Sequence, residues 1–214
     1  MKRIGLTGGI ASGKSTASSI LRELGAVIID ADAVAHELAE KGQPLYEAYV
    51  RHFGRGILRP DGSLDRRRLG QLVFTQAEEK AWLDQTSHPL IRAAMKKKWA
   101  EAEAKGVKAV VLDIPLLFET GWQKKLDETW LIYVPEEVQL LRLQQRNGYP
   151  CAEAMSRIKA QMPIEEKRNL ADRVIDNTGS REALQAKLKA LWQGLMAENG
   201  QTDEKHEKGR EHIC

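Results

Sequence analysis

Residues 3–16 read RIGLTGGIASGKST, and this stretch decides the fold. A short run of strand-forming residues ends at Gly8, and residues 8–15 then fit the pattern G-x-x-x-x-G-K-[ST] at every fixed position. A helical pattern, STASSILREL, follows at once. A strand, a glycine-rich turn and a helix in this order are typical of a phosphate-binding loop. The sequence therefore predicts a phosphate site at the start of its first helix.

Each residue type in this loop has a mechanical reason. The glycines let the backbone curl so that successive N–H groups point at an anion, and the helix N-terminus adds partial positive charge. Lys14 is expected to reach the β- and γ-phosphates, and Ser15 to offer its hydroxyl to Mg²⁺. The alternative is an accidental glycine turn, which would match in roughly one chain in a hundred of this length.

Length, charge and cysteine content narrow the class of protein. The chain has 214 residues, 33 basic and 30 acidic, so its net charge is only +3. This length suits one folding unit with appendages, and the balanced charge predicts no nucleic-acid partner. No run approaches the ~20 apolar residues of a membrane span. Cys151 and Cys214 lack zinc or disulfide spacing, so we expect a cytoplasmic protein with no membrane partner.

Short apolar runs alternate with helical patterns along the chain. Because parallel strands need long crossovers and are buried on both faces, this alternation predicts a five-stranded parallel sheet between helical layers. The predicted fold class is thus α/β, a three-layer sandwich like that of P-loop kinases. The expected strands lie at 3–7, 26–30, 108–114, 129–134 and 173–177.

Two helical excursions interrupt the predicted sheet, at 33–106 and 136–168. Phosphate loops also serve NTPase switches and motors, but a small kinase must exclude water from the γ-phosphate and bind an acceptor beside it. We therefore expect the first excursion to bind the acceptor and the second to form a lid. The predicted nucleotide-binding core is 1–32, 107–135 and 169–198, and the polar tail 199–214 is expected to be disordered.

Carboxylates follow two of the expected strands. Asp30 and Asp32 come at the carboxyl end of the second strand, where ligands of open α/β sheets bind. One of them can accept the proton of an attacking hydroxyl, and we favour Asp32; the alternative is that both cap the helix that follows. Asp113 ends the third strand and is either a carboxylate near Mg²⁺ or a turn cap before Pro115.

Basic residues of the two excursions offer further candidates. Arg142 and Arg146 share a helix face in the predicted lid, where they can neutralise charge on a transferring phosphoryl group. Arg157 on the next helix and the run 66–68 of three arginines can also meet phosphates, although a solvated surface is the commoner role. For His88, which precedes Pro89, a structural role is the ordinary expectation.

Six segments together resemble one kinase family. In order they are GLTGGIASGKST, VIIDADAVAHEL, HPLIR, DIPLLFE, LLRLQQRN and ADRVIDNTGS. The chain is similar to the dephospho-coenzyme A kinases from residue 3 to about residue 195. The resemblance implies transfer of the γ-phosphate of ATP to the ribose 3'-hydroxyl of dephospho-CoA, the last step of coenzyme A synthesis. Another small-molecule or nucleoside kinase is the alternative, and the absence of an NKxD motif counts against a GTPase.

The resemblance also implies a site. Asp32 would be the base at the 3'-hydroxyl, Arg142 or Arg146 would act from the lid, and Mg²⁺ would bind at Ser15. The acceptor would lie near His88, Leu116, Leu117 and Glu119. The nucleotide would contact Gly8, Gly9, Ile10, Ala11, Ser12, Gly13, Lys14, Ser15, Thr16 and, near the adenine, Asn177.

Overall fold

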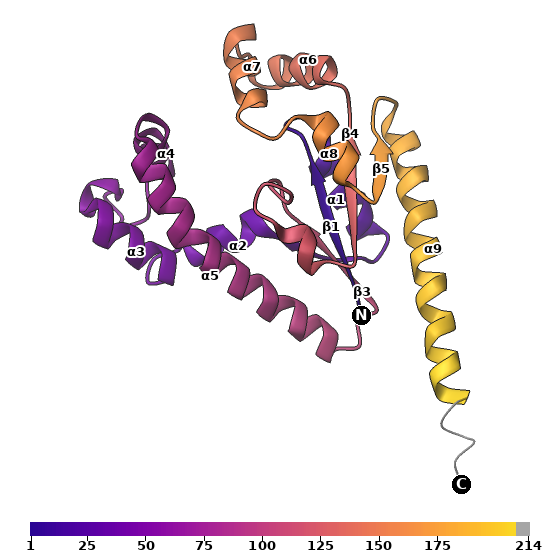
Figure 1. Cartoon of the computed structure of the whole chain (residues 1–214). Coiled ribbons are helices and arrows are strands. Elements are labelled where there is room, and N and C mark those ends of the chain that lie inside the picture. The colour runs from indigo at the N-terminus through magenta and orange to yellow at the C-terminus, as the bar shows by residue number, and fades with distance from the viewer. Residues whose placement is uncertain (209–214) are drawn as a thin grey trace. The chain divides into compact units, whose positions relative to one another are not determined.

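The structure is a computed structural model that describes residues 1–208, with side chains at all of these positions except 74, 75 and 198–208. Figure 1 shows the strands and helices in chain order by colour. The strands are β1 (Lys2–Gly8), β2 (Val27–Asp30), β3 (Ala109–Asp113), β4 (Glu128–Tyr133) and β5 (Arg173–Asp176). The helices are α1 (Lys14–Glu23), α2 (Ala31–Leu38), α3 (Pro44–Phe53), α4 (Arg66–Thr75), α5 (Ala77–Ala104), α6 (Glu136–Asn147), α7 (Cys151–Lys159), α8 (Ile164–Leu170) and α9 (Arg181–Lys208). Short 3₁₀ turns lie at Arg55–Ile57 and Trp122–Lys125.

The five strands form one sheet in the order β2-β3-β1-β4-β5. Strand β1 lies at its centre and pairs in parallel with β3 and β4, and β4 pairs in parallel with β5. In this register Ile4 lies between Val111 and Glu128. The predicted α/β class and its five-stranded parallel sheet are confirmed. Because β1 is central, the glycine loop that follows it leaves the sheet from the middle of its carboxyl edge.

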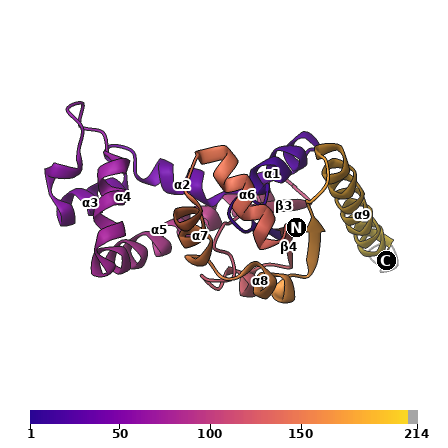
Figure 2. The ribbon, with the colours of Figure 1, turned by 90° about the horizontal axis from the view of Figure 1, so that it is seen from above.

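Helices α1 and α9 pack against each other beside β1 and β5 (Figures 1 and 2). The core between them and the sheet is apolar: Ile4 and Leu6 of β1 meet Ile20 of α1 and Leu188 of α9, all fully buried. Burial of such side chains contributes roughly 1.5–3 kcal/mol each. This face explains why β1 is apolar at alternate positions.

The opposite face of β1 carries Gly5, and a close approach requires that glycine. A Cβ at this position would overlap Leu117 and Leu126, which come from the segment between β3 and β4. Helix α8 packs beside β4. Strand β3 is buried along its whole length, as the long apolar run in the sequence predicted. The sheet is therefore covered on both faces.

The chain divides into two compact units, residues 1–28 with 102–214 and residues 29–101. The second unit is helical apart from the end of β2 and an isolated antiparallel bridge between Leu58 and Leu64. It has its own apolar core, in which Tyr46 and Tyr49 of α3 are buried with Leu69 of α4. The sequence predicted a helical insertion at 33–106, and the observed helical unit overlaps it.

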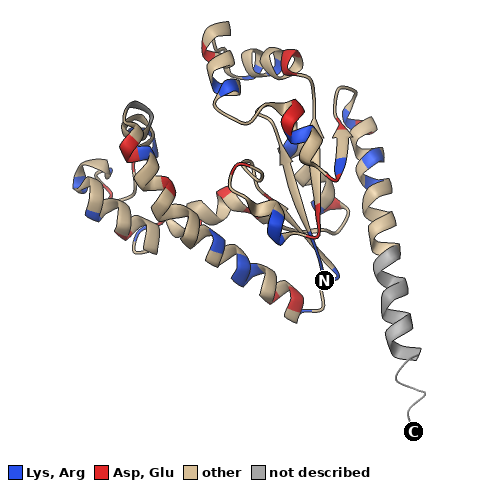
Figure 3. Ribbon diagram, viewed as in Figure 1, with Lys and Arg blue, Asp and Glu red and all other residues tan. Residues whose placement is uncertain are grey.

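Three features differ from the sequence-based expectation. Helices α3 and α8 were not anticipated; α8 is a single short segment that begins just after Pro163. Helix α9 continues to Lys208, so 199–208 of the predicted disordered tail is helical, and 209–214 lies outside the described residues. Basic and acidic residues are both present on each of the two units (Figure 3). In the described part of the chain, no helix has the length and apolar character that crossing a membrane requires.

Candidate active site

The loop between β1 and α1 has the backbone of an anion cradle. Gly13 adopts a left-handed conformation, with φ of 93°, directly before the first residue of α1. The Asn177 amide occupies the space that a Cβ at this position would fill. Ala11 also has a positive φ, 59°, which is uncommon for a residue other than glycine. This path turns the loop back on itself ahead of the N–H groups of α1.

The first two glycines of the loop are required by close contacts. A Cβ on Gly8 would overlap the Ser12 hydroxyl, and one on Gly9 would overlap the Gln139 amide. The Ser12 Oγ is buried and makes no hydrogen bond with any residue that the structure describes. A buried hydroxyl without a protein partner inside a glycine cradle fits a phosphate oxygen.

Lys14 forms an ion pair with Asp113, whose side chain is almost completely buried. The two residues meet because β1 and β3 are parallel neighbours, so their carboxyl ends lie at the same edge of the sheet. Next to this pair, the Thr7 hydroxyl donates to the Pro115 carbonyl over 3.1 Å. The sequence left the role of Asp113 open, and the structure places it on the loop lysine.

Asn177 connects the loop to β4 and to α6. Its side-chain amide donates to the Ser12 carbonyl over 2.7 Å, and its backbone N–H donates to Tyr133. The Arg142 guanidinium in turn donates to the Asn177 carbonyl over 2.9 Å. The structure thus brings together the predicted residues Asn177 and Arg142 beside the phosphate loop.

The predicted lid helices also reach the loop. Helices α6 and α7 pack together around Leu143, Ala154 and Ile158, and Ile10 and Ala11 of the phosphate loop pack against this small core (Figure 2). The backbone N–H of Ile10 donates to the Gln161 side chain over 3.0 Å. The segment after α7 therefore holds the outer part of the phosphate loop.

Comparison with known proteins decides the family. A family model described as dephospho-CoA kinase matches residues 2–183. The chain belongs to the dephospho-CoA kinase family. It is 47% identical over 200 residues to the dephospho-CoA kinase of Symbiobacterium thermophilum, covering 94% of this chain and 84% of that one. It is 50% identical over 190 residues to that of Carboxydothermus hydrogenoformans, covering 89% and 92%. The solved dephospho-CoA kinase from Campylobacter jejuni superposes with a TM-score of 0.72 at 32% identity, covering 93% and 100%.

The two carboxylates at the end of β2, Asp30 and Asp32, have different places in the helical unit. Asp30 is the N-cap of α2, and its carboxylate accepts from the backbone N–H groups of Asp32 and Ala33 at 2.8 and 3.1 Å. The capping alternative is therefore confirmed for Asp30. Asp32 lies in the first turn of α2 with an exposed side chain. Its role as the base stays a prediction.

Other candidates of the helical unit lie on its surface. His88 is followed by Pro89 within α5, and its ring nitrogen is 3.8 Å from an Asp84 carboxylate oxygen. Arg66 donates to the His36 carbonyl over 3.3 Å. Both contacts stay within the helical unit, and the predicted contacts of His88 and Arg66 with the acceptor stay predictions.

The segment after Asp113 separates into buried and accessible residues. Leu117 is fully buried and packs over Gly5, so it is a core residue, and its predicted contact with the acceptor is not supported. Leu116 beside it is 38% exposed. Glu119 accepts from the Met162 backbone N–H over 3.1 Å. Of the two leucines, only Leu116 offers a surface to a substrate.

The other lid arginines differ from Arg142 in their partners. Arg146 is exposed and donates to the side chain of its neighbour Asn147 over 2.8 Å. Arg157 pairs with Glu153 at 2.9 Å and lies 4.4 Å from the centre of the Tyr149 ring. Both sets of contacts stay within the lid.

Sequence reasoning missed three polar residues of the predicted lid segment. Gln139 is buried against Gly9, Gln161 binds the Ile10 N–H, and Lys167 is fully buried at the base of the lid. The signal for α8 was available, because Pro163 is followed by Glu165 and Glu166 in a first helical turn. Nothing local in the sequence marked Lys167 as buried.

Proposed function

We propose that this chain transfers the γ-phosphoryl group of ATP to the ribose 3'-hydroxyl of dephospho-CoA, giving CoA and ADP, in the cytoplasm. The observation that carries the proposal is the phosphate loop with Lys14 paired to Asp113, in a chain whose relatives of 47 and 50% identity are named dephospho-CoA kinases. Lys14 is already held at the loop, so it needs only to exchange part of its contact with Asp113 for a phosphate.

ATP binding is assigned to the loop and to Asn177. Backbone N–H groups at the α1 end of the loop of residues 8–16 would hold the phosphates. The buried Ser12 hydroxyl would gain a phosphate partner. Asn177, which already holds the loop at the Ser12 carbonyl, would lie near the adenine.

The residues present fit a magnesium ion that is held mainly by phosphates. Among the described residues there is no cluster of three or more His, Cys, Asp or Glu side chains suited to a metal. Ser15, exposed at the start of α1, would supply the protein ligand, with the Asp113 carboxylate as a nearby acceptor. When bound, Mg²⁺ neutralises charge on the β- and γ-phosphates.

The acceptor is assigned to the helical unit and to the segment after β3. Asp32 would accept a hydrogen bond from the 3'-hydroxyl and take up its proton, while His88 and Leu116 would line the acceptor site. Support for Asp32 comes from its place in the first turn of α2, where the exposed carboxylate is not the cap and is available for a substrate hydroxyl. Phosphoryl transfer needs little covalent help, so alignment is its main task.

Arg142 and Arg146 are assigned to the nucleotide from the lid side. Arg142 already reaches the Asn177 carbonyl, and Arg146 lies one helical turn further along the same face of α6. Either guanidinium can neutralise the transferring phosphoryl group.

A coupled assay that follows ADP release tests this function. We expect turnover with ATP and dephospho-CoA, little hydrolysis with ATP alone, and none with CoA, whose 3'-position is already phosphorylated. Adenosine as acceptor separates the proposal from a nucleoside kinase. Equal ADP release with and without dephospho-CoA would contradict the proposal and favour a nucleotide-dependent switch.

A further inference from the structure

Lys167 of α8 is a charged side chain with no exposed surface. Lysine is almost never fully buried unless it is paired, because removing its charge from water is costly. None of the proposed catalytic or binding roles involves Lys167. The contacts of Lys167 therefore indicate which segments of the chain it keeps in position.

The Lys167 ammonium has two partners in the segment that follows β3. It lies 2.7 Å from a carboxylate oxygen of Glu119 and donates to the Pro115 carbonyl over 3.3 Å. The same carbonyl accepts from the Thr7 hydroxyl of β1. Both ends of the segment 115–119 are thus tied by the lysine, and one end is also tied to the central strand.

This segment continues directly from the chemistry of the loop. Pro115 comes two residues after Asp113, which pairs with Lys14. A shift of the Pro115 carbonyl would move the backbone that carries Asp113. Lys167 is therefore coupled to the loop lysine through covalent backbone and two hydrogen bonds.

The contacts of Glu119 also extend to the lid. The Glu119 oxygen that pairs with Lys167 also accepts from the Met162 N–H, and Gln161 next to it accepts from the Ile10 N–H of the phosphate loop. The strap of residues 161–167 is thus attached at one end to the phosphate loop and at the other to the segment after β3.

We propose that Lys167 and Glu119 form a positioning pair, which holds the segment 115–119 and the lid strap in one fixed arrangement around the phosphate loop. The inference rests on the proposed kinase function. Lys167 touches no substrate; it acts through the Pro115 carbonyl and through Glu119. Glu119 is then chiefly a lid anchor and not a ligand of the acceptor. Loss of the pair misplaces reacting groups, and a misplacement of about 1 Å can cost about 100-fold in rate.

The decisive variants are Lys167→Met, Glu119→Gln and the double variant. Lys2→Met is the matched control, since Lys2 also pairs with a glutamate, Glu128 at 3.3 Å, at the opposite edge of the sheet. Lys167→Met leaves the Glu119 charge without its lysine, whereas the double variant removes both charges and should recover thermal stability. We expect Lys167→Met and the double variant each to lower kcat about 100-fold, while KM for ATP stays within about threefold of the wild-type value.

The double variant separates positioning from stability. If the pair only stabilised the fold, the double variant should regain the wild-type kcat together with the wild-type thermal midpoint. This result would overturn the proposal. A folded Lys167→Met enzyme with full kcat, or one no slower than Lys2→Met, would do so as well. If neither Lys167 variant folds, Glu119→Gln decides, because reduced kcat at unchanged KM supports the pair and full kcat refutes it.

Hydrogen exchange gives a readout that does not depend on the acceptor. The N–H groups of Thr120, Gly121 and Trp122 donate to carbonyls of 116–118 at 3.0–3.1 Å. We expect these amides to exchange faster in Lys167→Met and at the wild-type rate in Lys2→Met. Unchanged exchange in Lys167→Met overturns the positioning role, whereas a wild-type enzyme inactive on dephospho-CoA overturns the proposed function alone.

Discussion

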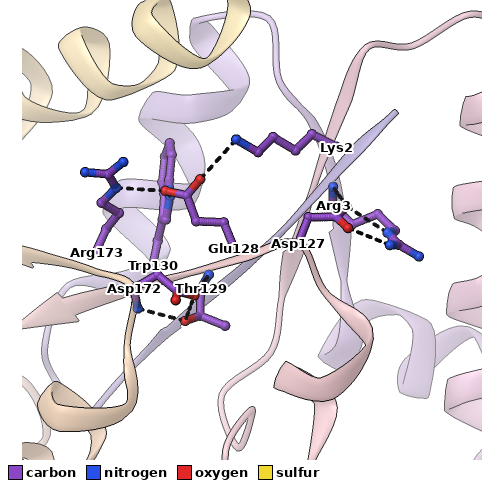
Figure 4. Close-up of polar contacts among 8 residues, drawn as sticks. All are labelled: Lys2, Arg3, Asp127, Glu128, Thr129, Trp130, Asp172 and Arg173. Carbon is purple, nitrogen blue, oxygen red and sulfur yellow. Dashed lines mark hydrogen bonds and ion pairs between the residues drawn. The ribbon is translucent and has the colours of Figure 1, made fainter. Parts of the chain in front are cut away.

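Charged residues gather at both the carboxyl edge and the amino edge of the sheet, where the strands end and begin. Their roles at the two edges differ. At the carboxyl edge, Lys14 and Asp113 pair beside a glycine loop whose buried Ser12 hydroxyl has no partner among the described residues, and Lys167 pairs with Glu119 in the segment after β3. At the amino edge, the first residues of β1, β4 and β5 satisfy one another directly (Figure 4). The comparison shows that charge alone does not mark a site. The site is marked instead by a buried donor that lacks a protein partner, the Ser12 hydroxyl.

Residues at the start of β1 and β4 make the first pair of the amino edge. Arg3 binds Asp127 with its Nε and a terminal nitrogen, at 2.9 and 2.6 Å, and also through its backbone N–H at 2.8 Å (Figure 4). These contacts, led by the side-chain hydrogen bond, hold the pKa of Asp127 below its ordinary value and that of Arg3 above it. The pair fastens the amino ends of two neighbouring strands.

Glu128 collects the second group of contacts. Burial raises the pKa of its carboxyl group, but hydrogen bonds from Arg173, Trp130 and Lys2 outweigh that effect and hold the pKa below its ordinary value. The Arg173 and Trp130 nitrogens lie 2.9 and 3.0 Å from the same carboxylate oxygen (Figure 4). These three donors all bind Glu128, so the contacts at this edge serve the fold.

The largest effect should follow Lys14→Ala at the carboxyl edge. We expect kcat to fall about 1000-fold or more, because the variant loses the cation at the transferred phosphate. Since Asp113 also loses an ion partner, stability should drop by about 1–3 kcal/mol. Coupled ADP release and thermal unfolding measure both. Lys2→Ala is the control, and equal activity of the two variants would remove the distinction between the edges.

Asp32→Asn should have the next largest effect. Loss of the base should slow turnover about 100- to 10,000-fold while ATP still binds. Asp30→Ala, two residues earlier, should cost about 1 kcal/mol through the lost helix cap and leave much of the activity. Steady-state kinetics and thermal midpoints of both variants provide the measurement. An active Asp32→Asn beside a folded, inactive Asp30→Ala would reverse the assignment.

The lid arginines should show a smaller loss. Alanine at the responsible position should lower kcat about 100- to 1000-fold with less change in ATP affinity, as expected for a contact made mainly in the transition state. Nucleotide titration and single-turnover rates for Arg142→Ala and Arg146→Ala separate binding from chemistry. Arg157→Ala, whose contacts stay within the lid, is the matched control. Full turnover in both test variants would make these arginines surface charges.

The smallest effect belongs to the amino edge. Asp127→Asn should leave kcat unchanged and lower stability by about 1 kcal/mol, because the pair with Arg3 is partly solvated. Chemical denaturation and the coupled assay test this. A large fall in kcat would show that the amino edge also controls the site.

Low pH should weaken the ion pairs of Asp127 and Glu128 at the amino edge. The pKa values of Asp127 and Glu128 are lowered by folding, so their contribution to stability is present above the unfolded values of about 4 and is lost as pH falls through the lower folded values. We expect Asp127→Asn to flatten the decline of the thermal midpoint between about pH 5 and pH 3. A decline as steep as that of wild type would mean that other carboxylates control acid unfolding.

Local patterns were sufficient for much of the fold. The phosphate loop, the strands and the cap at Asp30 could be predicted because each depends on residues adjacent in the sequence. Lys167 could not, since its burial depends on Glu119, which belongs to another element. Likewise, Leu116 and Leu117 are equivalent in the sequence, and only the close approach to Gly5 makes one of them a core residue.

By itself the sequence determined the anion cradle, the alternation of strands and helices, and membership of a kinase family. The tertiary structure decided which distant groups meet. The order β2-β3-β1-β4-β5 brings Asp113 to Lys14, and the return of β5 brings Asn177 to Ser12, 165 residues earlier. Backbone geometry follows from neighbouring residues, but such pairs form only after strands have chosen their neighbours by packing, a choice that spacing along the chain does not record.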